Sequence, residues 1–203
     1  INDQSTTQGL HNFGQDFVQT LQQIEIYKGA SGAHFGPSAI GGAINFITDI
    51  EYRNSLSVKG NFNTNILNSN YSMITDNGWH LNFKGSQTKS ETKSVRSKGV
   101  EKDGVLNQQL NINIKKWISD NLKLKSTIYV RQTDADYDGS DTDEEGFVAE
   151  DKMYAIQSGF DYKKDNKEDS LIIHYNGYDR EYDDSGVYLA TYYSESFGGN
   201  GHR

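Results

Sequence analysis

The sequence contains no cysteine and only one proline, Pro37. Without cysteine the chain can form neither a disulfide nor a thiolate metal site, although this excludes neither an oxidising nor a reducing compartment. No apolar run approaches the roughly 18–20 residues of a membrane-spanning helix. Apolar residues make up 34% of the chain, and the mean hydropathy is -0.78. The formal net charge of -8 argues against general nucleic-acid binding.

What the chain does contain favours β-structure. It has 13 Tyr, 9 Phe and 20 Gly, and this aromatic content, together with regular alternation, argues against disorder. The chain begins at Ile1 rather than at Met and ends just after the loop-like Gly198 to Gly201. We therefore expect a piece of a longer protein, in which the lack of a signal peptide carries no information.

From about Tyr52 the apolar residues follow a period of two, which is the signal for β-strands. The alternating apolar positions are Leu56, Val58, Gly60, Phe62; Trp79, Leu81, Phe83, Gly85; Leu110, Ile112, Ile114; Leu122, Leu124, Ile128, Val130; Tyr154, Ile156, Phe160, Tyr162; and Leu171, Ile173, Tyr175. Lys, Asn, Gln and Ser occupy the positions between them. The pattern predicts about seven strands, each with one apolar and one polar face.

Short and long connections alternate between these predicted strands. The short ones are Asp76 to Gly78, Ser119 to Asn121 and Lys164 to Asp169; the long polar ones are Ser90 to Asp103, Asp134 to Asp151, and Tyr182 onward. This rhythm is typical of an outer-membrane β-barrel, whose short turns face the periplasm and whose long loops face outside. Aromatic residues near strand ends, as expected for its girdles, are Trp79, Trp117, Tyr129 and Tyr162. A soluble β-sandwich, apolar inside and polar outside, would give the same alternation.

A second pattern precedes the strands. Residues Ile24 to Thr48 read IEIYKGASGAHFGPSAIGGAINFIT. This stretch resembles the end of the plug domain of TonB-dependent outer-membrane receptors. It departs from the family pattern at Ala30, where the family usually has Pro, and at His34-Phe35, where it has an apolar residue and Tyr. All of its glycines are retained.

The resemblance implies an all-β fold: a transmembrane antiparallel β-barrel, of about 22 strands when complete, preceded by the end of a plug. Residues 1–50 would be the C-terminal part of the plug and residues 51–203 the N-terminal part of the barrel. It also implies the outer membrane of a Gram-negative bacterium, contact with lipid, and energy from the inner-membrane TonB complex through a plug segment not in this chain. No cofactor is required.

The resemblance further gives roles to individual plug residues. In the family, a Glu and a basic residue of this motif form plug–barrel ion pairs, which here would be Glu25 and Lys28. Solvated strand charges are the alternative. Glycines that supply positive φ or close backbone approach in the plug turns would be Gly29, Gly36, Gly41 and Gly42.

The stretch from Asp134 to Asp151 holds nine acidic residues and neither Lys nor Arg. Asp134, Asp136, Asp138, Gly139 and Glu145 fit the D-x-D-x-D-G-x5-E spacing of a calcium loop, and hard carboxylate oxygens are what Ca²⁺ prefers. The flanks read as strands rather than as EF-hand helices, so a looser carboxylate cage is expected, with Asp183 and Asp184 as further ligands. A solvated acidic loop is the alternative.

Substrate contacts are expected from the loop that precedes the plug motif. In the family the matching loop rises to the extracellular apex of the plug; here it offers Gln4, Ser5, Thr6, Thr7, Gln8, His11, Asn12 and Phe13. Amides and hydroxyls suit a large polar chelate. The acidic stretch and the segment Tyr178 to Asp184 resemble the calcium-binding loops of the cobalamin (vitamin B12) receptor branch, so cobalamin is favoured, with ferric siderophores and haem as alternatives.

An enzyme is not expected. The chain has no G-x-S-x-G or H-E-x-x-H motif and no Ser/His/Asp cluster. Its acids lie in a stretch without the apolar cover that would shift their pKa values. A soluble calcium-binding β-sandwich adhesin is the alternative from another class, although it leaves the plug motif unexplained.

Overall fold

The computed structural model describes residues 18–30, 41–48, 52–93, 102–136, 147–184 and 188–202. The described chain is all-β and antiparallel. β1 and β2 form a two-stranded sheet, and the remaining eight strands form a meander in which each strand pairs with its neighbour in the chain. The strands are β1 (Gln23–Lys28), β2 (Gly42–Ile47), β3 (Ser55–Gly60), β4 (Thr64–Ile74), β5 (Trp79–Lys93), β6 (Lys102–Ser119), β7 (Leu122–Asp136), β8 (Phe147–Lys164), β9 (Lys167–Asp184) and β10 (Tyr188–His202).

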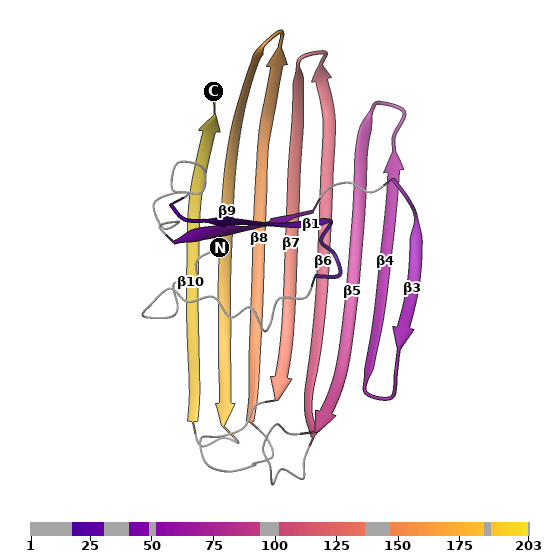
Figure 1. The fold of residues 1–203 in the computed structure, drawn as a ribbon, viewed down its shortest axis with the longest axis vertical. Helices are drawn as coiled ribbons and strands as arrows, with labels where there is room; N and C mark the ends of the chain where they lie inside the picture. The colour runs from indigo at the N-terminus through magenta and orange to yellow at the C-terminus, as the bar shows by residue number, and fades with distance from the viewer. Residues whose placement is uncertain are drawn as a thin grey trace.

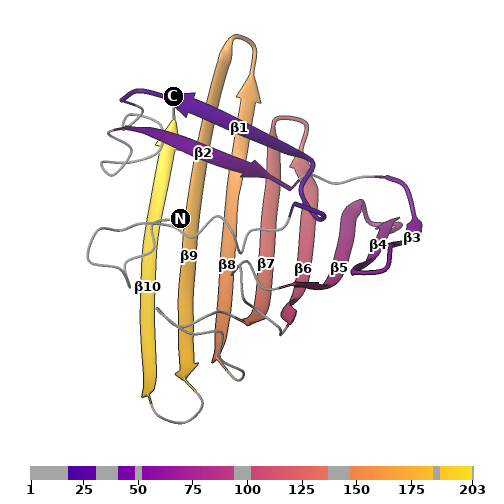
Figure 2. The same cartoon turned by 60° about the horizontal axis from the view of Figure 1, so that its bottom comes forward.

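The β1–β2 hairpin lies across one face of the large sheet (Figures 1 and 2). The large sheet curves toward that side at its β3 end (Figure 2) and is open, with β3 and β10 as its edges. Two hydrogen bonds place the hairpin's flanks on this face: Thr20 Oγ1 donates to Gln109 Oε1 at 3.0 Å, and Thr48 Oγ1 donates to Asn113 Oδ1 at 3.4 Å. We call this the inner face.

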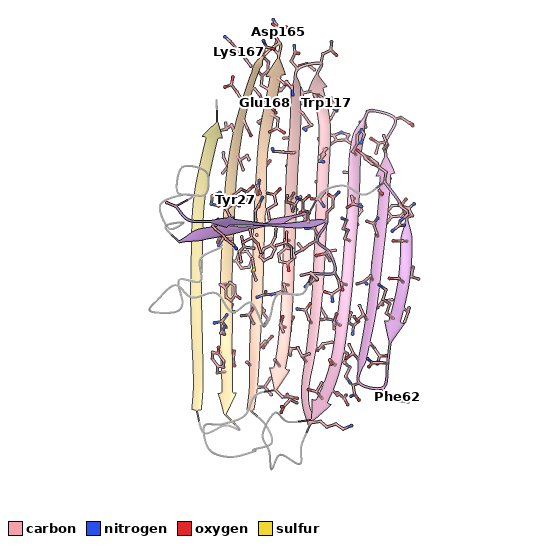
Figure 3. All side chains as sticks on the ribbon, in the orientation of Figure 1. Tyr27, Phe62, Trp117, Asp165, Lys167 and Glu168 are labelled. Atoms are coloured by element: carbon pink, nitrogen blue, oxygen red, sulfur yellow. The ribbon has the colours of Figure 1, made fainter. Side chains whose placement is uncertain are left out.

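The connections at one end of the sheet are tight turns, and we call it the turn end. At the first turn Gly78 has φ of 79°, and its N–H donates to the Thr75 carbonyl at 2.9 Å. At the last, Asp165 has φ of 54°, a left-handed conformation that Asp tolerates better than most residues. Figure 3 shows Trp117, Asp165, Lys167 and Glu168 at this end and Phe62 at the opposite, loop end.

The inner face is polar and buried. Its buried polar side chains are Asn70, Asn82, Lys84, Ser86, Thr88, Asn107, Gln109, Asn111, Asn113, Arg131, Thr133, Asp151 and Arg180. Among the described residues only Ala149, Met153 and Tyr178 are buried apolar or aromatic side chains. A soluble sheet buries its apolar face instead, so the polarity of this sheet is reversed.

The outer face carries the apolar residues, and they are exposed. Those that are at least a third exposed on β4 to β9 include Leu67, Tyr71, Met73, Phe83, Leu110, Val130, Ile156, Phe160, Leu171 and Ile173. On β7 and β8 they form a band that the register bounds by the pairs Leu122–Tyr162 and Val130–Tyr154, which is nine residues of each strand. A strand that crosses a bilayer at a tilt needs about 9–11 residues.

Between the band and the loop end, the outer face becomes polar. The register aligns Gln87, Gln108, Gln132, Lys152 and Asp179 in one row across β5 to β9. The next row contains Lys89, Leu106, Asp134, Glu150 and Glu181. We call these two rows the collar.

Several sequence expectations are corrected by these bounds. The sheet has eight strands rather than about seven, and three of them have 18 residues. The stretch from Tyr182 is not a long loop, because β9 runs to Asp184 and β10 begins at Tyr188. Polar residues continue the strands because backbone ladder hydrogen bonds do not depend on side-chain polarity. Of the expected girdle aromatics, Trp117 and Tyr129 lie in inner-face register, opposite Lys123 and Asn111.

Candidate functional site

A buried ionic cluster joins β7, β8 and β9 on the inner face. Asp151 is the centre: its Oδ1 accepts a hydrogen bond from Arg131 Nη2, and its Oδ2 accepts from Arg180 Nε at 3.0 Å and Nη2 at 2.9 Å. The Tyr178 hydroxyl accepts from Arg131 Nη2 at 2.7 Å and from Arg180 Nη2 at 3.2 Å. Both guanidinium groups also lie near the Tyr178 ring, with Cζ 5.7 and 5.1 Å from its centroid.

The strand register explains how these four residues meet. Asp151 lies directly opposite Arg180, and Met153 lies opposite both Arg131 and Tyr178. The side chains of Arg131 and Asp151 are fully buried and that of Arg180 is 5% exposed. The cluster carries two positive charges and one negative charge. Buried charges are costly unless they are paired, so the shared carboxylate holds three strands in one register.

An amide-rich wall continues the inner face onto β5, β6 and β7. Asn107 Nδ2 donates to Thr133 Oγ1 at 2.7 Å, and Asn113 Nδ2 donates to Asn111 Oδ1 at 2.5 Å. Buried atoms of this wall that have no hydrogen-bond partner among the described residues include Thr88 Oγ1, Asn107 Oδ1 and Asn111 Nδ2. Buried polar groups are normally paired with protein or with ordered water. These donor and acceptor atoms of the wall are therefore available for hydrogen bonds to water or to a polar solute.

The predicted ion-pair residues lie on β1. Glu25 accepts hydrogen bonds from Tyr27 Oη at 2.7 Å, Asn45 Nδ2 at 3.1 Å and Gln23 Nε2 at 3.1 Å, all within its own hairpin. The bonds from Tyr27 and then Asn45 lower the pKa of Glu25, and the same carboxylate raises the pKa of Tyr27. Within the described ranges neither Glu25 nor Lys28 forms an ion pair with the large sheet, so their plug–barrel role stays a prediction.

The predicted turn glycines differ in their surroundings. Gly29 and Gly42 have φ of 87° and 145°, which L side chains rarely adopt. A Cβ on Gly42 would also overlap the Tyr27 carbonyl oxygen. Gly41 has open space around it, and Gly36 lies outside the described residues. The substrate-contact residues Gln4, Ser5, Thr6, Thr7, Gln8, His11, Asn12 and Phe13 also lie outside them.

The predicted calcium ligands are only partly described. Asp134 and Asp136 belong to the end of β7 rather than to a loop. Asp134 Oδ1 accepts from Gln132 Nε2 at 3.3 Å, and Asp136 Oδ2 accepts from the Gly104 N–H at 2.8 Å. Asp138 and Glu145 lie outside the described residues. Asp183 and Asp184 belong to β9, where the pairing puts Asp183 opposite Val148, which is itself opposite Asp136.

The described side chains contain no group of three or more His, Asp or Glu that could hold a metal ion. The register does reveal two acids that sequence reasoning left out, since Glu150 and Glu181 share a row with Asp134. The ionic cluster of Arg131, Asp151, Tyr178 and Arg180 was also missed. The sequence offers one signal for it: Arg131, Asp151 and Arg180 occupy the polar positions of the alternating pattern, next to apolar residues such as Val130.

Comparison with protein-family models finds no family that matches the chain. Comparison with curated protein sequences finds no significant relative. No helix within the described ranges is long and apolar enough to cross a membrane. The family resemblance therefore stays a prediction that rests on the residues from Ile24 to Thr48.

Proposed function

We propose that this chain is part of a TonB-dependent receptor that carries a scarce, large nutrient across the outer membrane. Cobalamin is the favoured substrate. In this proposal the eight-stranded sheet is part of the barrel wall, and the β1–β2 hairpin belongs to the plug in its lumen. Energy comes from the inner-membrane TonB complex. Ferric siderophores and haem are the alternative substrates within the same family.

The observation that carries the proposal is the reversed polarity of the large sheet. Its outer face exposes Leu, Ile, Val and Phe side chains over nine residues of β7 and β8, which matches the length of a tilted bilayer-crossing strand. Its inner face is lined by amides, hydroxyls and compensated charges. Lipid-facing and lumen-facing residues alternate in this way in outer-membrane barrels.

The position of the hairpin adds support. A barrel large enough to carry a nutrient has a wide lumen that a plug must fill, and the hairpin lies against the polar face of the sheet through Thr20 and Thr48. Both of these contacts are hydroxyl–amide hydrogen bonds. Such contacts suit a plug that must be displaced without unfolding the wall.

The soluble β-sandwich adhesin agrees less well with the fold. A sandwich packs two sheets through their apolar faces, whereas the outer face here has no covering sheet within the described residues. That arrangement would leave a large apolar patch in water, which soluble monomers rarely tolerate.

The test is calorimetric titration of cyanocobalamin into the full-length protein in detergent, first with calcium and then with a chelator. Tight binding that weakens in chelator is the expected result, because the carboxylates near Asp134 and Asp136 would repel one another without a cation. A double substitution of Asp134 and Asp136 by Asn should remove the calcium dependence, whereas Asp169→Asn at the turn end should not. The absence of binding in both conditions would refute cobalamin as the substrate.

A further inference from the structure

Lys116 on β6 is placed differently from the other outer-face lysines. Its Nζ lies 4.7 Å from the centroid of the Trp79 ring, and the register puts it between Trp79 on β5 and Leu124 on β7. It therefore lies at the turn-end boundary of the apolar band. A cation over an indole ring is stabilised by the ring's electron density and still presents N–H donors outward.

The charges around Lys116 are unlike those of the collar. In the collar, Lys152 forms an ion pair with Glu150 at 2.6 Å. Lys89, also in the collar, pairs with Glu91, which lies just outside it, at 3.0 Å. Lys116 forms no ion pair with any residue of the described ranges. Asp161, the acid nearest to the band's turn-end edge on β8, has inner-face register and binds Lys125 at 2.7 Å. Asp169 shares the outer face with Lys116 but is three strands away.

A shallow depression lies in the apolar band between β8 and β9. The register places Phe160 of its lining in the same row as Lys116, two strands away across Leu124, which is about 10 Å at about 4.8 Å per strand and within the reach of an acyl chain. Its lining includes Ser158, whose hydroxyl shares a 2.7 Å hydrogen bond with that of Ser126 across β7 and β8. The rest of the lining is mostly apolar and includes Ile156, Phe160, Leu171 and Ile173, together with His174 and Tyr175. Because the two hydroxyls bond to each other, an apolar chain that covers them buries one hydrogen-bonded pair instead of two separate unpaired hydroxyls.

We propose that Lys116, Trp79 and this depression bind one anionic glycerophospholipid from the leaflet at the turn end, with its phosphate on Lys116 and an acyl chain over Ser126 and Ser158. The site rests on the proposed function, since it requires the outer face to meet lipid. An anionic headgroup fits better than a zwitterionic one, because a zwitterionic headgroup brings its own ammonium close to Lys116. The acidic collar leaves the loop end unsuited to such a lipid.

The experiment is native mass spectrometry of the full-length protein, released from detergent with increasing phosphatidylglycerol or phosphatidylcholine. Wild-type protein should bind phosphatidylglycerol more tightly. Lys116→Gln should weaken phosphatidylglycerol binding about fivefold, the contribution of about 1 kcal/mol expected of one basic residue at a membrane surface, and should leave phosphatidylcholine unchanged. Lys152→Gln, which removes a paired lysine of the collar, is the matched control and should change neither. Ser158→Leu, which fills the depression, should weaken both lipids.

Equal binding of the two lipids, or an equal effect of the two lysine substitutions, overturns the lipid site. Flotation of the protein with liposomes separates this result from failure of the proposed function. Protein that floats but shows no effect of Lys116→Gln refutes the lipid site alone. Protein that does not enter bilayers refutes both.

Discussion

The ionic cluster on β7, β8 and β9 gives the most direct test of what stabilises the large sheet. Asp151→Asn keeps the size of the side chain but removes the carboxylate that Arg131 and Arg180 share. Two buried guanidinium charges would then face each other beside Tyr178. Removing one partner of a buried ion pair typically costs about 3–5 kcal/mol, and we expect the upper part of that range because two cations lose the same partner.

The assay is urea unfolding of the full-length protein in detergent, followed by tryptophan fluorescence. A loss of this size should lower the midpoint with little change in the slope. Asp179→Asn, one residue away from the cluster and on the opposite face, is the matched control, and exposed or half-exposed substitutions usually stay within about 0.5 kcal/mol. Equal midpoints for the two variants would refute the reasoning.

A second variant separates the charge from the contact. Replacing Arg131 and Arg180 by Met together with Asp151 by Leu removes all three charges and keeps most of the volume. Apolar replacement of a whole buried ion pair or triad is often neutral or stabilising, so this triple variant should be more stable than Asp151→Asn. If it is the less stable of the two, the contacts rather than the unpaired charges determine stability.

Two further predictions concern the β8–β9 pair and the hairpin. Gly159→Ala should destabilise the protein by about 1–3 kcal/mol, because the new Cβ would overlap the Leu171 carbonyl oxygen, whereas Gly41→Ala, which has open space, should not; equal unfolding midpoints would contradict this. The lowered pKa of Glu25 means that its charged form stabilises the hairpin above the ordinary value of 4.5, and that this stabilisation is lost as the pH falls through the folded-state pKa. Hydrogen exchange of β1 and β2, corrected for intrinsic rates, should therefore show lower protection in acid for wild type but not for Glu25→Gln, and a pH dependence that survives in Glu25→Gln would count against it.

The alternation of apolar and polar residues predicted an all-β chain with strands at β3 and at β5 to β9, each with one apolar and one polar face, but it identified no residues of β4 or β10. It failed where strands continue through polar sequence, as at Asp134 to Asp136 and at Tyr182 to Asp184. There the backbone hydrogen bonds between strands continue past the apolar band. A polar sequence in such a position is easily predicted as a loop. Short turns were easier because Asn77-Gly78 carries its own conformational signal.

The ionic cluster could not be predicted in the same way. Arg131, Asp151 and Arg180 are separated by 20 and 29 positions in the chain. Their contact depends on the register of β7, β8 and β9, and a shift of one residue would move Asp151 to the other face. That register is fixed by turn lengths and by the pairing of whole strands, which no single residue reveals.

The reversed polarity of the sheet has a consequence for how this sequence can vary in evolution. In the proposed barrel the outer face meets lipid, which has no fixed shape. An outer-face position such as Leu110 or Val130 then needs only to remain apolar, and Leu, Ile, Val and Phe should replace one another there. An inner-face residue such as Asn107 or Asp151 has partners at defined distances, and a change requires a compensating change on a neighbouring strand. Among proteins of common descent, drift should therefore be fastest on the hydrophobic surface and slowest on the hydrophilic one, the opposite of the rule for soluble proteins.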